Sequence, residues 1–434
     1  MTAGLASPPA SSALDEARLT PRYWATFSLI VAQLICEIFD FFVVSFLVSA
    51  IAPKWGLTYG QSTVIFFAAG LGTMVGAVGF GWLSDRFGRK VAIVGGGILY
   101  SLSAGAIALI PEGAWGLFAA LRFLVGVGYG GAGSSQFALI AEYTPTRLRT
   151  VMTSSLGVPA AVGVVMASAV VAVLYPVFGW RGIAAIGATP IVLAFAIALV
   201  APESARWKAT RSAGAVAKVA GPSPLDVWRD QRRFWLIVLI QVGMGATLTG
   251  VLLWGPTVAG QILQMPLQRA AGYFVWITVC GLVGRIAFVF LSMWLGRVRC
   301  GMLMGFGGAI FVALAAIFHD VWFAAIPAFL LFLAIGELFF DGGFSNINPY
   351  APELFPVRVA AQAAGVASAA GGIGKIIGPV ALGLIAGAGE LVSPHATEHA
   401  VVPGFLFLAG CCLVAGLAYA FLGVETHGKA LRLE

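Results

Sequence analysis

Charged side chains are scarce in this chain, and this scarcity excludes most soluble folds. Asp, Glu, Lys and Arg make up 10% of its 434 residues, whereas soluble globular domains carry about 25%. Hydrophobic residues make up 60%, and glycine is frequent at 56 residues. Small residues let helices pack closely where lipid removes the hydrophobic drive between them. The composition therefore predicts an integral membrane protein in contact with the lipid bilayer.

Groupings of residues that would carry enzyme or metal chemistry are also absent from the sequence. The five cysteines have no metal-binding spacing, and no histidine cluster or nucleophile triad appears. An intramembrane aspartate protease needs Gly-x-Gly-Asp, but Asp341 follows Glu337-Leu-Phe-Phe. The net charge of +7 does not indicate nucleic-acid binding, because the basic residues are scattered over short connections. We expect no enzymatic activity, no metal, no cofactor and no nucleic-acid partner.

Long apolar runs account for most of what is present. Crossing the hydrocarbon core takes about 20 apolar residues, and the chain contains twelve such segments. We therefore predict an all-α membrane protein with twelve transmembrane helices. Their approximate bounds are 23–52, 62–83, 90–110, 114–141, 150–175, 181–201, 233–259, 268–295, 301–319, 322–350, 358–386 and 401–423.

The basic residues indicate how the chain crosses the bilayer. Most Lys and Arg residues outside the spans fall in connections on the side of the N-terminus, and only Lys54, Arg181 and Arg269 fall on the other side. Cytoplasmic loops carry the excess of positive charge. We therefore expect both termini in the cytoplasm. We also expect that the protein lies in the bacterial inner membrane and is a monomer.

The chain also divides into two similar parts. Glu142-Tyr-Thr-Pro-Thr-Arg147 follows the fourth span, and Glu353-Leu-Phe-Pro-Val-Arg358 follows the tenth. Gly296-Arg297 is a weaker echo of Gly88-Arg89. Parallel halves around a central site are a known transporter plan. The predicted order is a tail at 1–22, a six-helix half at 23–201, a linker at 202–232, a second six-helix half at 233–423 and a tail at 424–434.

One loop motif carries a resemblance to a known family. Gly81-Trp-Leu-Ser-Asp85-Arg86-Phe-Gly88-Arg89-Lys90, between the second and third spans, resembles the loop signature of the major facilitator superfamily. The resemblance implies the major facilitator fold, with two pseudo-repeated halves, and a cytoplasmic charge network that latches them. The residues expected in this gate are Asp85, Arg86, Arg89, Glu142, Arg147, Glu353 and Arg358.

Further motifs point to proton symporters within that superfamily. Glu37-Ile-Phe-Asp40-Phe-Phe is similar to the acidic motif of symporters for metabolites, sialate and aromatic acids, and Arg122 resembles an arginine shared by sugar and organic-acid symporters. Pro202-Glu203-Ser204 and Glu425-Thr426-His427 are similar to sugar-porter signatures, although His427 stands where a lysine is usual. The fifth span is a poor match to the antiporter motif, so uptake is favoured over export.

Seven ionisable side chains lie inside the predicted spans, where a central charge costs about 3 kcal/mol and marks a candidate functional site. They are Arg122, Arg285, Lys375, Glu37, Asp40, Glu337 and Asp341. The i, i+4, i+7 spacing puts Gln33, Glu37 and Asp40 on one face of the first span. Glu337 and Asp341 begin the same spacing in the tenth, and in a facilitator-like fold both stripes would line the central cavity.

Proton coupling is the role that we predict for Asp40, Glu37, Arg122 and Asp341. A carboxyl group in low-dielectric surroundings holds its proton, and a nearby cation releases it. Such a group can exchange protons as the cavity opens to either side, so protons are the expected coupling ion. The alternative for Asp40 and Arg122 is a static ion pair that only aligns helices.

An organic anion is the predicted substrate, because Arg285 and Lys375 are cations suited to a carboxylate. Permanent pairing of Lys375 with Glu337 or Asp341 is the alternative. Flat substrates could stack on Tyr273 and Trp276. The residues expected to bind substrate are Arg285, Lys375, Glu337, Gln33, Gln241, Tyr273, Trp276 and Asn348.

The resulting hypothesis is a secondary active transporter that takes up a small carboxylate by proton symport through alternating access. The alternatives are a proton-coupled sugar or polyol porter and a drug or metabolite antiporter.

Overall fold

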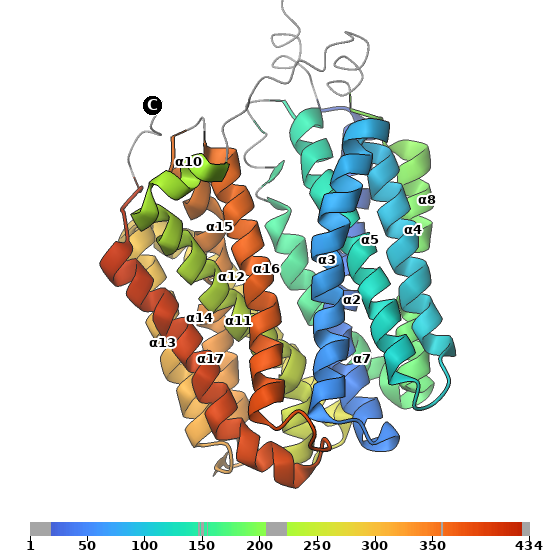
Figure 1. Cartoon of the computed structure of the whole chain (residues 1–434), viewed down its shortest axis with the longest axis vertical. Helices are drawn as coiled ribbons and strands as arrows, with labels where there is room; N and C mark the ends of the chain where they lie inside the picture. The colour runs from blue at the N-terminus through green and yellow to red at the C-terminus, as the bar shows by residue number, and fades with distance from the viewer. Residues whose placement is uncertain are drawn as a thin grey trace, which may run out of the picture.

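Long helices run side by side between two faces of the molecule (Figure 1). The structure is a computed structural model that describes residues 19–145, 148, 152–153, 155–204, 224–356 and 359–427. The first half of the chain contains α2 (Pro21–Trp55), α3 (Tyr59–Phe87), α4 (Arg89–Ala106), η1 (Ile107–Leu109), α5 (Trp115–Tyr143), α7 (Gly157–Ile186) and α8 (Ile191–Val200).

The second half begins with a short helix, α10 (Pro224–Arg229), inside the segment predicted as a linker. It continues with α11 (Gln231–Ile262), α12 (Leu267–Leu295), α13 (Arg297–Ile317), β1 (Trp322–Phe323), β2 (Ile326–Pro327), α14 (Ala328–Phe340), α15 (Phe344–Glu353), α16 (Ala360–Ile385) and α17 (Pro394–Leu422). Figure 1 shows the two halves as separate groups of helices, with α3 beside α16 where they meet.

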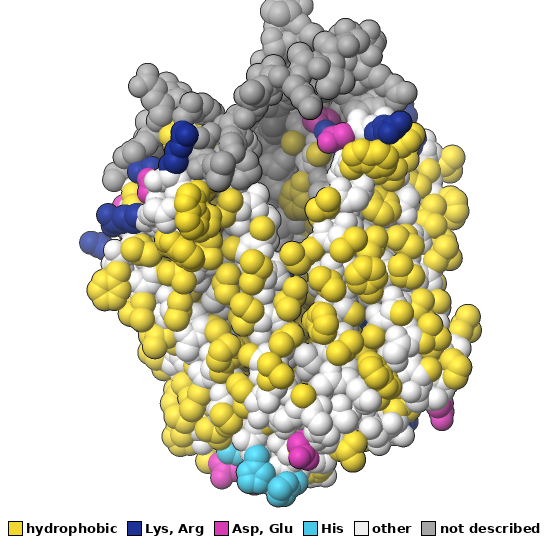
Figure 2. All heavy atoms as spheres, in the orientation of Figure 1, with side chains coloured by type: hydrophobic (Ala, Val, Ile, Leu, Met, Phe, Trp, Pro, Cys, Tyr) yellow, Lys and Arg dark blue, Asp and Glu magenta, His cyan; other side chains and the backbone are white. Residues whose placement is uncertain are grey.

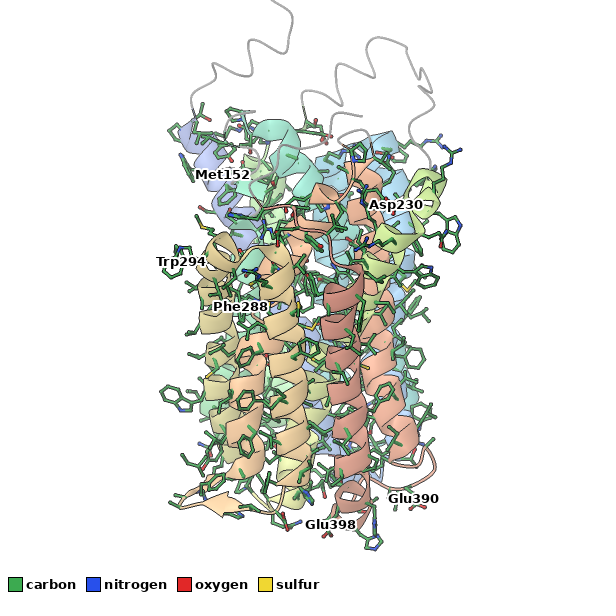
Figure 3. The ribbon with its side chains drawn as sticks, turned by 90° about the vertical axis from the view of Figure 1, so that its left-hand side faces the viewer. Met152, Asp230, Phe288, Trp294, Glu390 and Glu398 are labelled. Atoms are coloured by element: carbon green, nitrogen blue, oxygen red, sulfur yellow. The ribbon has the colours of Figure 1, made fainter. Side chains whose placement is uncertain are left out.

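Two faces of the molecule serve below as landmarks. The termini face carries Asp230 and Met152, and the opposite face carries Glu390 and Glu398 (Figure 3). At the termini face α2 begins on a cap, since the Thr20 side chain accepts a hydrogen bond from the Tyr23 amide. The long helices run from one of these faces toward the other (Figure 1).

The described residues contain eleven helical stretches long and apolar enough to cross a membrane. One of them, Gly157–Val200, has 44 residues, about twice what one crossing needs. It breaks at Gly179, which has φ 61° and ψ −170°, a conformation that glycine adopts without a steric penalty. Counting this stretch as two crossings gives the twelve spans that the sequence predicts.

The tenth span differs from its prediction. We expected it to begin at 322, but β1 and β2 form a small antiparallel hairpin there, and α14 begins only at Ala328. Ala324 in the hairpin turn has φ 55°. The apolar side chains of this hairpin made it look like part of the helix. The span then continues through a turn at Asp341–Gly343 into α15.

Glycines permit the closest helix contacts in both halves. A Cβ atom on Gly76 of α3 would lie 2.1 Å from the Val127 carbonyl oxygen of α5. A Cβ atom on Gly378 of α16 would lie 2.0 Å from the Ala246 carbonyl oxygen of α11. Both distances are far below a van der Waals contact, so only glycine fits there. This is the packing that the glycine content predicts.

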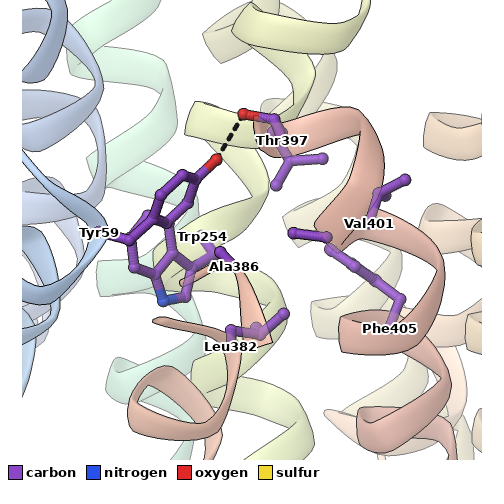
Figure 4. Close-up of a pocket in the computed structure, with 9 residues that line it drawn as sticks. Tyr59, Trp254, Leu382, Ala386, Thr397, Val401 and Phe405 are labelled. Carbon is purple, nitrogen blue, oxygen red and sulfur yellow. Dashed lines mark hydrogen bonds between the residues drawn. The ribbon is translucent and has the colours of Figure 1, made fainter. Parts of the chain in front are cut away.

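The two halves are joined at the opposite face by a set of contacts that we name the loop clasp: residues 57–60 against residues 388–392 and Thr397. The Gly60 amide donates to the Ala388 carbonyl at 2.9 Å, and the Val392 amide donates to the Leu57 carbonyl at 3.0 Å. The Tyr59 and Thr397 hydroxyls are 2.5 Å apart. Figure 4 shows this hydroxyl pair beside an apolar pocket that is lined by Leu382, Val401, Phe405 and other apolar side chains.

Further contacts across the halves also lie toward the opposite face. The Phe46 and Phe274 rings are 6.0 Å apart between centroids, and the Trp254 ring packs on Tyr59 and Phe66. At the termini face the surface is hollowed between the halves (Figure 2). The structure is therefore closed at the opposite face and diverges toward the termini face.

Candidate functional site

Asp40 and Arg122 form a buried ion pair between α2 and α5. Arg122 Nη1 lies 2.7 Å from Asp40 Oδ2. Asp40 is 5% exposed, and Arg122 is 1% exposed. The guanidinium also donates to the backbone carbonyls of Asp40, at 3.2 Å, and Phe41, at 3.5 Å. The structure thus brings this predicted pair together within the first half, and its role in proton coupling stays a prediction.

Glu37 lies one helical turn before Asp40 and is bound by two amides. Its Oε1 accepts hydrogen bonds from Gln33 Nε2 at 3.0 Å and from Gln136 Nε2 at 2.9 Å. The sequence analysis missed Gln136. A signal was available, because Gln136 follows Arg122 by about four turns of α5 and so shares its face. These bonds occupy the Nε2 atoms of both glutamines, whereas their buried Oε1 atoms have no hydrogen-bond partner among the described residues.

Arg285 and Asp341 form the corresponding pair in the second half. Arg285 Nε donates to Asp341 Oδ2 at 2.9 Å, and Nη2 donates to Oδ1 at 2.6 Å. This is the bidentate geometry that suits a carboxylate. Arg285 Nη1 also donates to the Gly157 carbonyl of α7 at 3.3 Å, which links the two halves. The fork proposed for a substrate carboxylate is therefore occupied here by Asp341.

Glu337 shares a face of α14 with Asp341 and is 1% exposed. Both of its carboxyl oxygens are buried, and neither has a hydrogen-bond partner among the described residues. Asp341, by contrast, satisfies both oxygens on Arg285. The acidic stripe predicted in the tenth span thus contains one paired carboxylate and one without a partner.

Lys375 of α16 reaches toward the first half. Its Nζ lies 5.9 Å from the centroid of the Phe41 ring, and its side chain is partly buried. Within the described residues no ion pair joins Lys375 to a carboxylate, so the alternative of permanent pairing with Glu337 or Asp341 is not what the structure shows. Of the three cations inside the predicted spans, Arg122 and Arg285 have carboxylate partners and Lys375 has none there.

The remaining residues predicted to bind substrate fall in different places. Gln33 is fully buried against Glu37, and Gln241 is buried with its Oε1 directed at Gly371. The Tyr273 hydroxyl donates to the Ala325 carbonyl in the β1–β2 hairpin, at the opposite face. Asn348 is exposed. These positions leave Gln241 near the helix of Lys375 and place Tyr273 away from it.

Trp276 lies on the outside of the bundle. Trp276 is 70% exposed, and two other aromatic residues of the same helix are also exposed, Phe290 at 61% and Trp294 at 85%. Figure 3 shows Trp294 pointing outward. This exposed apolar stripe of α12 faces the lipid in a membrane. The placement argues against the predicted stacking of a substrate on Trp276. The aromatic ring near Lys375 is instead that of Phe41, which in turn contacts the rings of Phe42 and Tyr129.

A charge network occupies the termini face of the first half. Arg89 at the start of α4 lies 2.5 Å from Asp85 and 3.5 Å from Glu142. Arg86 stacks its guanidinium over the Trp82 ring. The Glu203 carboxylate accepts a hydrogen bond from the Arg89 backbone amide at 2.9 Å. The predicted gate residue Arg147 lies outside the described residues.

The second half repeats this network. Arg297 at the start of α13 forms a bidentate pair with Glu353, at 2.7 and 3.1 Å. Glu425 accepts from the backbone amides of Arg297 and Val298, at 2.8 and 3.1 Å. The predicted gate residue Arg358 lies outside the described residues. In the sequence, Glu203 and Glu425 stood out only as parts of signatures. A signal for their role was available, because one glutamate follows the last span of each half, and each of the two caps the start of a helix.

Backbone amides also set the proton affinity of Glu425, which follows the last membrane helix. Partial burial by itself would raise the pKa of this carboxyl. Hydrogen bonds from the amides of His427, Arg297, Val298 and Thr426 outweigh burial and lower its pKa below the ordinary value. The carboxylate form therefore stabilises the start of α13.

Comparison with known proteins agrees with this architecture. A family model described as Major Facilitator Superfamily matches residues 29–379. The niacin transporter NiaP of Acinetobacter baylyi is 28% identical over 425 residues, covering 90% of this chain and 91% of the relative. The cis,cis-muconate transport protein of the same organism is 25% identical over 358 residues, covering 81% and 85%.

Solved structures show the same fold. A bacterial homologue of the human lysosomal transporter Spinster, in an inward-facing and unoccupied conformation, superimposes with a TM-score of 0.75. The two chains are 16% identical, and the match covers 93% of this chain and 97% of the homologue.

Proposed function

Because this chain belongs to the Major Facilitator Superfamily, it is a membrane transporter and not an enzyme, and we propose that it takes up a small organic carboxylate together with protons. The observation that carries the proposal is the absence of a carboxylate partner for Lys375 in the part of the chain that the structure describes. A cation that is partly removed from water is costly unless it is paired. An anionic substrate would supply the missing charge.

The surroundings of Lys375 support a flat substrate. Phe41 lies beside its ammonium group, and the Phe41 ring is 5.1 Å from Phe42 and 6.2 Å from Tyr129 between centroids. Conjugated and aromatic acids present a planar face to such rings. The names of two relatives, for niacin and for cis,cis-muconate, refer to acids of this kind. We therefore place the carboxylate at Lys375 and the rest of the substrate against Phe41.

Asp40 and Arg122 are the proposed proton-coupling pair. The carboxyl group lies on the same helix as Phe41, so it can respond to an anion bound there. A proton on Asp40 would weaken its contact with Arg122 and change the packing of α2 on α5. We also propose that the termini face is cytoplasmic, which makes the present conformation open to the inside.

The alternative of a sugar porter has less support from this site. Sugar hydroxyls need both hydrogen-bond donors and acceptors, but the amide nitrogens of Gln33 and Gln136 are bound to Glu37, which leaves only their buried Oε1 atoms free within the described part of the chain. A neutral sugar would also leave Lys375 without a counter-charge. Transport of a neutral polyol that is faster than transport of any carboxylate would favour this alternative.

Uptake into proteoliposomes tests the proposed function. Nicotinate and muconate are the first substrates to offer, with an imposed gradient that is acidic outside. We expect accumulation that rises with the gradient and collapses when a protonophore is added. Accumulation that persists unchanged after the protonophore would contradict proton symport, and transport of none of a series of carboxylates would contradict the substrate class.

A further inference from the structure

Glu337 is a buried acid that the proposed function leaves without a role. It faces α12 at Gly281, where an added Cβ atom would lie 3.0 Å from the Glu337 Cγ atom. The absence of a side chain on Gly281 makes room for the Glu337 side chain and for the Asp341 carboxylate, whose Oδ2 atom would lie 2.8 Å from that Cβ atom. The thiols of Cys280 on α12 and Cys412 on α17 also lie within electrostatic range. Glu337 is 1% exposed, so the carboxyl group lies inside the second half.

The groups around Glu337 offer no compensation for a negative charge. Both carboxyl oxygens are buried and have no hydrogen-bond partner among the described residues. Asp341, one turn further along, adds a like charge. Arg285 is the nearby cation, but its Nε and Nη2 atoms are bonded to Asp341. The charged residues of α11 and α13 lie in their first turns, far along the helix from this depth.

An ionised carboxylate in such a place would lack both solvation and pairing, which makes the charged form strongly unfavourable. A carboxylic acid with its proton carries no net charge and avoids this cost. Glu37, the comparable acid of the first half, differs because two amides donate to it. The two acids therefore have different hydrogen-bonding surroundings in the same protein.

We infer that Glu337 is a second proton-binding site, occupied by a proton in the conformation that is open at the termini face and separate from the Asp40–Arg122 pair. Binding forms one O–H bond on the Glu337 carboxyl group, and release breaks it. The released proton passes to water at the rim, where the Arg285 side chain keeps 15% exposure. Its part in coupling, though not its protonation, rests on the proposed function.

Arg285 supplies a means of release. Its Nη1 atom is held by the Gly157 carbonyl of the other half, so this bond must change when the halves move relative to each other. A guanidinium that turns from Asp341 toward Glu337 would favour the ionised form of Glu337. Movement of the halves and loss of the proton would then be linked through one side chain.

Infrared difference spectroscopy of the purified protein tests the inference without requiring transport. Protonated carboxylic acids absorb in a carbonyl-stretch region apart from carboxylates and amides, and the band shifts in heavy water. We expect Glu337→Gln to remove a band that wild type shows at neutral pH. Glu398→Gln, which makes the same chemical change at an exposed position, should leave the band intact.

Two further outcomes keep the test decisive. If Glu337→Gln does not fold, Glu337→Asp should move the band while keeping a carboxylic acid at the site. A band that is unchanged in a folded Glu337→Gln protein, or unmoved in Glu337→Asp, would overturn the inference.

In proteoliposomes that do transport a carboxylate, the number of protons taken up per substrate should fall by one in Glu337→Gln. A transport assay that fails in wild type would count against the proposed function and leave the infrared result standing.

Discussion

At the scale of single residues, each half of the protein uses one arginine in the same way. Arg122 and Arg285 each hold an aspartate from a neighbouring helix, at 2.7 and 2.6 Å. Removing one partner of such a buried pair costs about 3–5 kcal/mol, because it leaves an uncompensated charge. An amide in place of the aspartate also leaves the arginine charge uncompensated, but it keeps a hydrogen-bond acceptor of the same shape, so it disturbs these sites less than truncation does.

The first prediction concerns Asp40. Asp40→Asn keeps the size and hydrogen-bonding capacity of the side chain but removes its titrating group. Arg122 keeps its bonds to the backbone carbonyls of Asp40 and Phe41 but loses its counter-charge, so we expect the variant to fold with lower stability than wild type. We expect the variant to lose accumulation of substrate and to retain exchange of labelled for unlabelled substrate across the proteoliposome membrane. A variant that concentrates substrate as well as wild type would show that Asp40 has a structural role only.

The second prediction uses the lowered pKa of Glu425. A depressed folded-state pKa means that the carboxylate adds stability above its unfolded-state pKa of about 4.3, and that this stability is lost as the pH falls through the folded-state value. Glu425→Gln should therefore lower the thermal unfolding temperature at neutral pH. The difference from wild type should shrink below about pH 4.

Glu398→Gln is the matched control for Glu425→Gln, because it neutralises a glutamate on the exposed surface of α17. It should have little effect on the unfolding temperature. An equal loss of stability in both variants at every pH would contradict the capping role of Glu425.

At the scale of helices and loops, glycine decides how closely the elements approach. Gly76 faces Val127 across the α3–α5 contact, whereas Gly79, one turn later on the same helix, has open space around it: a Cβ atom added there would meet no heavy atom within 4 Å. The same substitution at these two sites therefore separates packing from helix propensity.

We expect Gly76→Ala to destabilise the protein by about 1–3 kcal/mol, the usual cost of overpacking. Gly79→Ala should be neutral or stabilising by up to about 1 kcal/mol, since alanine favours a helix. Thermal unfolding in one detergent compares the two variants. Equal stability of the two variants would show that α3 and α5 are less tightly packed than the structure indicates.

The loop clasp gives a prediction about conformation. A Cβ atom on Gly60 would lie 2.7 Å from the Ala388 carbonyl oxygen, which accepts the Gly60 amide hydrogen bond. Gly60→Ala should weaken the clasp and increase the population that is open at the opposite face. Spin labels across the clasp would report this change as a longer distance between the halves. Gly389→Ala is the control, because nothing lies within 4 Å of its added Cβ, and it should leave the distance unchanged.

At the scale of the whole molecule, the sequence predicts the helical architecture well because a membrane span is a local property of about 20 residues. The spacing of acids along a helix predicts that Glu337 and Asp341 share a face, and both side chains approach Gly281 of α12. It could not predict which face of α12 meets lipid, so Trp276 was placed at the substrate. Nor could it predict that Arg285 pairs with Asp341 while Lys375 does not, since these contacts depend on how separate helices pack.

Binding of the substrate carboxylate by Lys375 is what the proposed function depends on. Calorimetry on purified wild type and Lys375→Gln, with nicotinate and with its neutral amide, measures this binding. We predict that wild type binds the acid and not the amide, and that Lys375→Gln weakens binding of the acid by about 2–5 kcal/mol, as for a desolvated charge pair. Lys375→Arg should be tolerated better, because it keeps the positive charge. Equal affinity of wild type for the acid and the amide, or full affinity for the acid in Lys375→Gln, would contradict the claim.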